Sequence, residues 1–348
     1  MDKIGVGLIG CGAVSSRHFE AIKQIENFEL KAVCDVDKTS AEKNGRLYGA
    51  DYYTSVKKLL DRNDISLVSI CTPIFTHTGI AMQALRAGKH VLTEKPVGLT
   101  LKAIDKLIDV GKKTGKKIFV VHQVRYSASI YALKHAIDSG MLGNILACNL
   151  VVRWFRPENY FTDKWYGKKN LAGGTLLNQG IHYIDIMQWL AGDIKTVIGL
   201  TDNLRYPKLD IEDYISALVF FKHGAVGQIE INILTYDKNY ECSFTVMGSK
   251  GTVKLSGKAL QSIEYWNVEG YEKPLIPDGL PNYIKTKGFD PTALPTHEDV
   301  YRDVIFNLRQ GDSNSNTVDA VEARKSVALA LAIYKSSEKD CRKIDLEA

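Results

Sequence analysis

Two side chains in this sequence have the chemistry that the oxidation of an alcohol needs. His182 lies in a stretch with helical patterning, and Lys95 stands between Glu94 and Pro96. In such an oxidation a hydride passes from carbon to a nicotinamide while a base takes the hydroxyl proton. A histidine suits the base because its unperturbed pKa of about 6.5 lies near working pH. A lysine can stabilise the developing alkoxide and lower the histidine pKa. We expect His182 to be the base and Lys95 its electrostatic partner; the reverse assignment stays open.

Two polar side chains accompany His182 at helical spacing. Asn178 precedes it by four residues and Asp185 follows it by three, so on an α-helix all three share one face. Asn178 can hold a substrate hydroxyl, and Asp185 can orient the imidazole or serve only in a structural pair. The structural alternative for His182 is a satisfied core or surface histidine.

A glycine-rich turn follows the first apolar segment. Gly10 and Gly12 permit a sharp strand-to-helix turn and let backbone N–H groups approach a pyrophosphate. A helix beginning near Ala13, with Val14 beside it, would direct its positive end at those phosphates. Asp35, which we expect to close the second strand, can take both hydroxyls of an adenosine ribose and would repel a 2′-phosphate. The turn therefore predicts NAD rather than NADP, with a purely structural turn as the alternative.

A basic and aromatic stretch covers residues 153–170. Such a mixture can grip a uridine diphosphate, with charge on the pyrophosphate and a ring against the base. It can also form a subunit contact, since Trp, Tyr and Arg are enriched in interfaces. Single-stranded nucleic acid is the least favoured ligand. The residues are Arg153, Trp154, Phe155, Arg156, Tyr160, Phe161, Lys164, Trp165, Tyr166, Lys168 and Lys169.

The first third of the chain alternates short apolar runs with helix-like stretches. Runs separated by helices of about 10–15 residues are typical of βαβ units and a parallel sheet. We predict a Rossmann domain, a doubly wound α/β fold, over residues 1–122. Its expected strands are 4–9, 30–34, 67–71, 90–92 and 118–121, and its expected helices lie near 14–25, 38–48, 56–62, 76–87 and 100–114.

The rest of the chain, residues 123–348, predicts a second domain of the α+β class with a mostly antiparallel, open-faced sheet. His223-Gly224 suits a hairpin turn between two of its strands, residues 270–295 are expected to be irregular, and the final helix is allowed to pack back on the first domain. The expected strands are 144–152, 215–221, 225–233, 242–247, 251–255 and 262–266, and the expected helices are 127–139, 174–191, 297–309 and 318–337.

Composition and charge narrow the class of protein. The 348 residues are 45% hydrophobic and 24% charged, as in an ordinary globular protein, and no apolar run is long enough to span a bilayer. Six scattered cysteines without a CxxC pair argue against a disulfide scaffold and a zinc site. The net charge of +5 decides nothing about partners. We expect a cytoplasmic protein with no metal, no nucleic-acid partner and no membrane association.

Three segments together resemble one protein family. Ser-Ile-Cys-Thr-Pro-Ile-Phe-Thr-His at 69–77, Ala-Gly-Lys-His-Val-Leu-Thr-Glu-Lys-Pro at 87–96 and Gly-Gly-Thr-Leu-Leu-Asn-Gln-Gly-Ile-His at 173–182 are similar to motifs of the glucose–fructose oxidoreductase / inositol dehydrogenase (Gfo/Idh/MocA) family. The resemblance implies an NAD-dependent oxidoreductase acting on a CH–OH group of a sugar. The cofactor contacts that it implies are Thr72, Pro73, Thr76, His77, Glu94, Lys95 and Gln123.

Within that family, residues 178–182, 123–125, 132–134 and 165–167 look most like the nucleotide-sugar 3-dehydrogenases. Those enzymes oxidise C3 of UDP-N-acetylglucosamine or its uronic acid. Many relatives carry Asp at Asn178 and Asn at Ile74, so this chain departs from the pattern at two positions. The implied substrate contacts are Lys95, Arg125, Arg153, Tyr160, Trp165, Asn178, Gln179 and His182.

Two other functions remain open from the sequence. One is a free-sugar or inositol dehydrogenase of the same family, and the other is a cofactor-binding regulatory protein without turnover. The joint presence of Lys95 and His182 disfavours the regulatory protein, since binding alone needs neither. An exposed sheet face in the second domain would need cover, so a homodimer or homotetramer is expected.

Overall fold

The computed structural model describes residues 3–162, 165–275, 293–310 and 316–346. It divides the chain into two units: unit 1 is Met1–Gln123 with Thr296–Arg324, and unit 2 is Val124–Pro295 with Lys325–Ala348. The sequence analysis expected an uninterrupted second domain, whereas the chain returns to unit 1 near its end. Lys164 and most of the stretch expected to be irregular lie outside the described residues.

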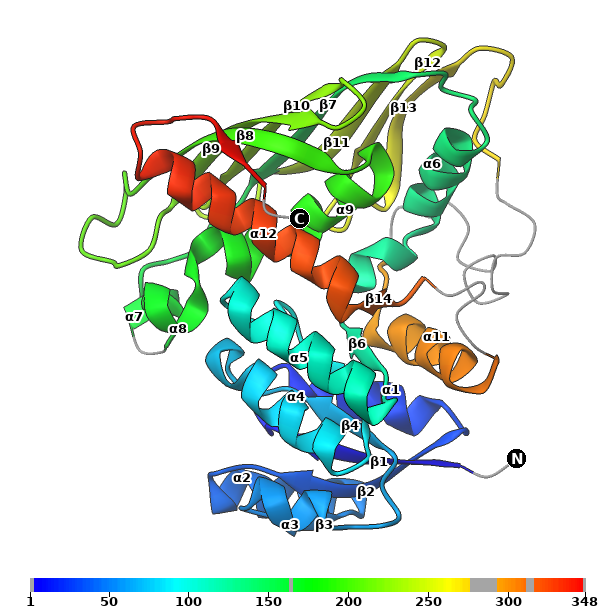
Figure 1. Ribbon diagram of the computed structural model, residues 1–348, viewed down its shortest axis with the longest axis vertical. Coiled ribbons are helices and arrows are strands. Elements are labelled where there is room, and N and C mark those ends of the chain that lie inside the picture. The colour runs from blue at the N-terminus through cyan, green and yellow to red at the C-terminus, as the bar shows by residue number, and fades with distance from the viewer. Residues whose placement is uncertain (1–2, 163–164, 276–292, 311–315, 347–348) are drawn as a thin grey trace. The chain divides into compact units, whose positions relative to one another are not determined.

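The sheet of unit 1 has the strand order β14-β6-β5-β4-β1-β2-β3 (Figure 1). Every neighbouring pair is parallel except β14 with β6. All residues of β4 are buried, so both faces of the sheet are covered, as in a doubly wound fold. The strands are β1 (Ile4–Ile9), β2 (Phe28–Cys34), β3 (Asp51–Tyr53), β4 (Leu67–Ile70), β5 (His90–Thr93), β6 (Ile118–Val120) and β14 (Val318–Asp319).

The helices of unit 1 begin where the sequence offers a cap or a turn. The Asp37 carboxylate accepts the N–H groups of Thr39 and Ser40 at the start of α2, and the Thr100 hydroxyl accepts the N–H of Ala103 in α5. The helices are α1 (Ser15–Gln24), α2 (Lys38–Tyr48), α3 (Val56–Leu60), the 3-10 helix η1 (Ile74–Thr76), α4 (His77–Arg86), α5 (Leu101–Thr114) and α11 (His297–Gln310). The predicted Rossmann fold is confirmed.

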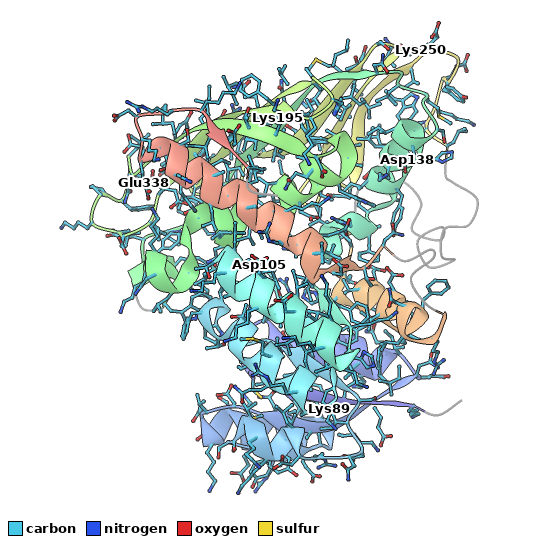
Figure 2. The ribbon with its side chains drawn as sticks, viewed as in Figure 1. Lys89, Asp105, Asp138, Lys195, Lys250 and Glu338 are labelled. Carbon is cyan, nitrogen blue, oxygen red and sulfur yellow. The ribbon has the colours of Figure 1, made fainter. Side chains whose placement is uncertain are left out.

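The late segment 296–324 contacts the rest of unit 1 at several points, two of them near its end. Strand β14 adds to the free edge of β6, with Val318 opposite Val120. Arg324 Nε donates to Asp105 Oδ1 of α5 at 2.5 Å, and Figure 2 labels Asp105 on that helix. The α12 helix (Ala320–Ser337) therefore starts in unit 1 and continues into unit 2.

The sheet of unit 2 has the order β13-β12-β11-β7-β10-β9-β8-β15 (Figure 1). It is mostly antiparallel, with β7 and β10 running parallel. The predicted hairpin turn is confirmed: Gly224 has a φ of +97°, and its N–H donates to Phe221 O at 3.1 Å. The strands are β7 (Ile145–Arg153), β8 (Ile194–Asp202), β9 (Tyr214–Phe221), β10 (Val226–Asn232), β11 (Glu241–Gly248), β12 (Gly251–Ser256), β13 (Ser262–Val268) and β15 (Ile344–Asp345).

Helices pack on one face of the unit 2 sheet, with α9 against β7. Buried and exposed residues alternate along β9 and β10, so the other face keeps apolar side chains in solvent. The helical segments are α6 (Ala128–Asp138), α7 (Asn159–Thr162), η3 (Trp165–Gly167), α8 (Lys169–Ala172), the π-helical η4 (Leu176–Gly180) and α9 (Ile181–Ala191). Among the described helices, none combines the length and the apolar character of a membrane span.

Candidate active site

The glycine-rich turn joins β1 to α1 at the carboxyl end of the parallel sheet. Gly10 has a φ of +95°, and a Cβ there would lie 2.7 Å from the carbonyl group of Cys71, so only glycine fits. A Cβ at Gly12 would meet no atom within 4 Å. The turn is therefore tight on its inner side and open at Gly12, which is the space that a pyrophosphate approaching the backbone would need.

The first helix starts slightly later than the sequence analysis expected. Ala13 and Val14 still belong to the turn, and α1 begins at Ser15. Val14 provides no side-chain cap for the helix. An uncapped helix N-terminus beside an open glycine turn suits an anionic ligand, because its first N–H groups lack side-chain acceptors.

Asp35 follows β2 and is fastened to the glycine-rich turn. Its Oδ2 accepts the Cys11 N–H at 2.7 Å and its Oδ1 accepts the Asp37 N–H at 2.9 Å. Burial and the charge of Asp35 raise the pKa of the Cys11 thiol to about 12, so the thiol stays neutral. Each carboxylate oxygen keeps acceptor capacity for a ribose hydroxyl. Asp35 thus has the position and the chemistry of an adenosine-ribose ligand.

The loop after β4 contains Thr72, Pro73, Thr76 and His77. The two threonine hydroxyl oxygens lie 2.7 Å apart, and that of Thr76 donates to Pro73 O at 2.7 Å. The ring of His77 is buried between Thr72 O and Pro96 O, at 2.8 Å from each. Burial lowers the pKa of His77, and a neutral ring can donate its one N–H to only one of the two carbonyls. His77 therefore lies against both this loop and the loop after β5.

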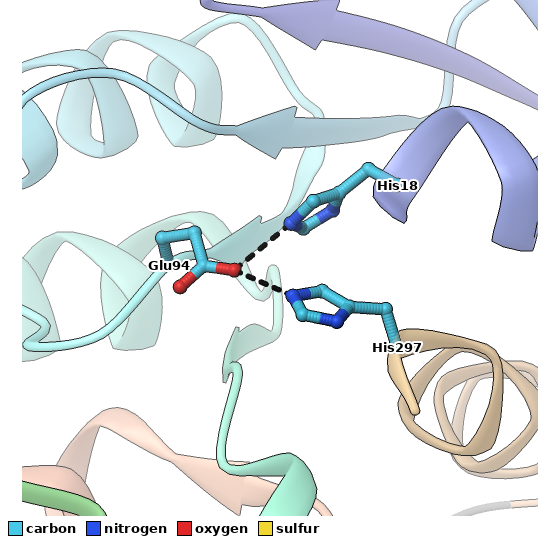
Figure 3. A group of neighbouring side chains, drawn as sticks. All are labelled: His18, Glu94 and His297. Carbon is cyan, nitrogen blue, oxygen red and sulfur yellow. Dashed lines mark hydrogen bonds and ion pairs between the residues drawn. The ribbon is translucent and has the colours of Figure 1, made fainter. Parts of the chain in front are cut away.

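Glu94 lies at the centre of a buried cluster (Figure 3). Its Oε1 accepts from His18 Nε2 at 3.0 Å and from His297 Nε2 at 2.8 Å, and its Oε2 accepts the Lys95 N–H at 3.2 Å. From the sequence, His297 and Tyr301 were expected to be no more than a helix-face pair and His18 was not singled out, because no local pattern connects residues so distant in sequence. Within the described part of the chain, these three side chains form the single group of ligand atoms close enough together to hold a metal ion.

Gln123 ends the first segment of unit 1. Its buried Oε1 has no hydrogen-bond partner among the described residues. A buried acceptor without a partner is costly unless a ligand or water supplies a donor. The Gln123 Oε1 atom could therefore accept a hydrogen bond from a cofactor donor such as a carboxamide.

The helix that carries His182 does not start as expected. The sequence analysis expected α-helix over 174–191, and this is wrong for its first part, where Asn178 and Gln179 lie in the π-helical η4. The turns of a π-helix are wider, so the α-helical face expected for Asn178 and His182 does not follow from the backbone. His182 itself lies in the first turn of α9 and is 8% exposed. π-Helical turns of this kind are frequent at functional sites.

Asp185 and Arg125 form a buried ion pair in unit 2. Arg125 Nε donates to Asp185 Oδ2 at 2.7 Å and Arg125 Nη2 donates to Oδ1 at 2.8 Å. The guanidinium also stacks 4.6 Å from the ring centre of Trp189. These contacts hold α9 in place, so Asp185 has the structural partner that was one of its two expected roles. Arg125 was expected to contact substrate, but its charge is already balanced by Asp185.

Glu212 supports the glycine pair that precedes η4. Its Oε1 accepts the Leu176 N–H at 2.8 Å and the Tyr334 hydroxyl at 2.6 Å. Gly174 has a φ of +91°, and a Cβ there would lie 2.4 Å from Glu212 Oε2. Burial raises the pKa of Glu212, which favours its protonated form. Glu212 and Tyr334 thus shape the start of the histidine-bearing segment, although no motif signalled either residue.

The arginines of the basic and aromatic stretch have different surroundings. Arg153 is paired with Glu230 at 2.7 Å and with Glu241 at 2.9 Å. Arg156 has no carboxylate partner among the described residues: it donates to Gln179 Oε1 at 2.9 Å and lies 4.8 Å from the ring centre of Trp154. Arg156 is therefore the arginine whose charge remains available, whereas the sequence analysis chose Arg153.

Aromatic rings extend this cluster. Tyr160 stacks on Tyr166, with ring centres 5.1 Å apart, and its hydroxyl accepts from Gln179 Nε2 at 3.1 Å. The ring of Trp165 lies 4.3 Å from that of Tyr166. The expected substrate contacts Tyr160, Trp165 and Gln179 are thus gathered in one part of unit 2, together with Arg156.

Known proteins are similar to this chain in sequence and in fold. Residues 4–122 match the family model described as "Oxidoreductase family, NAD-binding Rossmann fold", and residues 130–254 match the "GFO/IDH/MocA C-terminal domain". The inositol 2-dehydrogenase of Rhizobium meliloti is 29% identical over 275 residues, covering 78% of this chain and 81% of that protein.

Two solved structures are similar over nearly the full length. The WlbA dehydrogenase from Bordetella pertussis, in complex with NADH and UDP-GlcNAcA, is 31% identical with a TM-score of 0.88, covering 99% of both chains. The WlbA dehydrogenase from Chromobacterium violaceum, with the same ligands, is 31% identical with a TM-score of 0.89, covering 100% of this chain and 97% of that one.

The Rossmann unit, its open glycine turn and the acceptor at Asp35 agree with these similarities. The predicted resemblance and the predicted cofactor are confirmed. The chain belongs to the GFO/IDH/MocA family and is an NAD-dependent oxidoreductase that acts on a CH–OH group.

Proposed function

We propose that this protein oxidises the C3 hydroxyl of a nucleotide sugar of the UDP-N-acetylglucosamine type, in its hydroxymethyl or its uronic acid form. The observation that carries the proposal is the likeness to two dehydrogenases whose structures hold NADH and UDP-GlcNAcA. NAD supplies the hydride acceptor. In the proposed reaction His182 removes the hydroxyl proton, Lys95 stabilises the alkoxide and Asn178 holds a sugar hydroxyl.

Arg156 supports a substrate that carries negative charge. Its guanidinium is partly buried, lies beside Trp154 and Tyr160 and meets only neutral groups among the described residues. A partly buried cation without an anion is poorly compensated. A diphosphate would provide that anion and an adjacent ring could stack on uracil, whereas a free sugar would provide neither.

A free-sugar or inositol dehydrogenase is the second candidate. Inositol dehydrogenases are among the relatives, including one from Lacticaseibacillus casei that is 30% identical over 75% of this chain and 74% of that protein. Asn178 disfavours it, because many relatives have Asp at this position and an amide cannot relay a proton as a carboxylate can. The regulatory alternative is disfavoured by Lys95 and His182.

The substrate proposal predicts a specific pattern of NADH production. With NAD, UDP-N-acetylglucosamine or its uronic acid should produce NADH absorbance, whereas inositol and free glucose should not. Arg156→Leu should raise the KM for the UDP-sugar at least tenfold with little change in the KM for NAD, because it removes the cation for the diphosphate. The matched control is Arg342→Leu, an exposed arginine of unit 2. Faster turnover of inositol than of any UDP-sugar would refute the proposal.

The proposed roles of His182 and Lys95 can be separated by mutation. His182→Asn should lower kcat by roughly 10²–10⁴, the usual value of a positioned base. Lys95→Met should also lower kcat, and the double variant should lose less than the product of the two losses, because the residues act together. NADH affinity, measured by fluorescence titration, should change little in His182→Asn.

The pH profile tests the same assignment. Oxidation should rise with pH through one ionisation as the base loses its proton, and in Lys95→Met the apparent pKa should move upward because a neighbouring positive charge is gone. If His182→Asn keeps most of its turnover while Lys95→Met is inactive, lysine is the base and the roles are reversed.

The preference for NAD should depend on Asp35. Asp35→Ser should weaken NAD binding and improve NADP binding, because a repelling carboxylate is removed. Asp35→Asn is the matched variant, since its amide oxygen can still accept the Cys11 N–H that holds the turn. Comparing the NAD and NADP affinities of the two variants shows whether the loss of the Asp35 charge or the loss of the hydrogen bond to the turn changes cofactor preference. A wild-type preference for NADP of tenfold, about 1.4 kcal/mol, would contradict this role of Asp35.

We also propose a homodimer or homotetramer. Leu200, Leu218 and Val226 on the outer face of the unit 2 sheet are 44%, 50% and 48% exposed. Cross-strand pairing places Leu218 beside Ile198 and Val226 beside Phe220, which makes a continuous apolar stripe. Such a stripe is costly in water unless another surface covers it. Light scattering should give a mass of at least twice 38.7 kDa, and a Leu218→Lys variant should shift it downward; a wild-type monomer would refute the proposal.

A further inference from the structure

Tyr301, Ser69 and His18 form a hydrogen-bonded group beside Glu94, in which the Tyr301 hydroxyl oxygen also lies 3.1 Å from His18 Nδ1. The Tyr301 hydroxyl donates to Ser69 Oγ at 2.9 Å, and Ser69 Oγ lies 3.0 Å from His18 Nδ1. His18 Nε2 in turn lies 3.0 Å from Glu94 Oε1. All these residues are buried in unit 1, and they come from α1, β4, the end of β5 and α11.

The protonation states in this cluster follow from its surroundings. Burial alone would raise the pKa of Glu94, but the hydrogen bonds from His18 and His297 outweigh it and hold the pKa well below its usual value. Burial lowers the pKa of His18. An ionised Glu94 can only accept, so both imidazole Nε2 atoms donate to it, and the neutral His18 ring accepts from Ser69 at Nδ1.

Distances in the cluster match hydrogen bonds better than metal ligation. The Glu94 oxygen lies 2.8 Å and 3.0 Å from the two Nε2 atoms. Ligands about 2.0 Å from a tetrahedral ion would be about 3.3 Å apart. The observed spacing is therefore that of a donating N–H and an accepting oxygen.

The second oxygen of Glu94 connects this cluster to the loop that carries Lys95. Oε2 accepts the backbone N–H of Lys95 at 3.2 Å. A carboxylate fixed by two imidazoles at one oxygen therefore presents its other oxygen in a fixed direction. Loss of one of the two donors at Oε1 would hold the carboxylate less firmly and weaken its hydrogen bond with the Lys95 N–H.

We propose that His18, His297 and Tyr301 are positioning residues for Lys95. They fix the Glu94 carboxylate, which holds the backbone of the lysine in the geometry that the reaction needs. His297 and Tyr301 both lie in α11, so the segment that returns to unit 1 late in the chain helps to position Lys95, which comes about 200 residues earlier. The inference rests on the proposed catalytic role of Lys95.

Substitution of His297 tests the proposal. His297→Ala removes one donor to Glu94 and should lower kcat by roughly 10–100-fold, the scale of a small misplacement of a catalytic group. The Kd for NADH, measured by fluorescence titration, should stay within about threefold, because the imidazole acts on the lysine loop. His297→Gln keeps an N–H donor and should restore most of the turnover.

The pH profile supplies a readout that a purely structural role would not change. With one donor lost, the Glu94 pKa rises, so in His297→Ala the acid limb of kcat, which in the wild type reports the base alone, should gain a second ionisation from Glu94 and move upward in pH. Tyr301→Phe should shift it in the same direction by less. The other groups that bear on Glu94 and its partners are unchanged in these variants: Arg17, His18, Cys71, His77 and Lys95.

A matched control uses a histidine of the strand that ends at Glu94. His90 begins β5, and its Nδ1 accepts the Lys117 N–H at 3.1 Å outside the cluster. His90→Ala should lower the melting temperature without moving the acid limb or the kcat. If His297→Ala behaves like this control, the proposal is overturned. It is also overturned if NADH affinity falls in step with kcat, or if the purified protein contains one equivalent of a metal that His297→Ala loses.

Comparison with Lys95→Met separates this proposal from the proposed function. If Lys95→Met keeps its turnover, the proposed role of the lysine fails and the positioning role fails with it. If Lys95→Met is inactive while His297→Ala keeps the wild-type kcat and acid limb, only the positioning role fails. In the double variant, loss of His297 should add nothing to the loss of Lys95, because it acts through the lysine.

Discussion

The cost of burying a carboxylate constrains three places in this chain that lie beside residues proposed for chemistry. Glu94, Asp185 and Glu212 are all buried, and an ionised carboxylate without partners would be expelled from such surroundings. Each has a different solution. Glu94 is ionised between two imidazole donors, Asp185 is paired with Arg125, and Glu212 is surrounded by a phenol and a backbone N–H while burial raises its pKa.

Each of these three carboxylates lies next to a segment whose backbone position matters for the proposed chemistry. Glu94 precedes Lys95, Asp185 lies one turn after His182, and Glu212 supports the glycine pair before η4. A buried carboxylate tolerates few arrangements of donors, so the segments that supply those donors are held together. The residues proposed for chemistry therefore depend on buried polar networks in the segments next to them.

The same reasoning separates the arginines of unit 2. Among Arg125, Arg153 and Arg156, the first two are neutralised within the unit by acidic side chains, whereas Arg156 keeps a charge that no described carboxylate balances. A count of basic residues treats all three alike. Their surroundings decide which one is able to meet an anionic substrate, because an arginine already paired with carboxylates gains little from a second anion.

Much of this protein is determined by local sequence. Periodicity predicted the strands of the parallel sheet except β3, His223-Gly224 predicted the hairpin, and Gly10 and Asp35 predicted the cofactor turn, because each depends on neighbours along the chain. Other features needed the tertiary structure. The π-helical turn at Asn178 starts at Leu176, whose N–H is held by the distant Glu212. The return of residues 296–324 to unit 1 and the contact of His18 and His297 with Glu94 also join segments far apart in sequence. No spacing rule reports such contacts, since packing between distant segments decides which side chains can satisfy a buried charge.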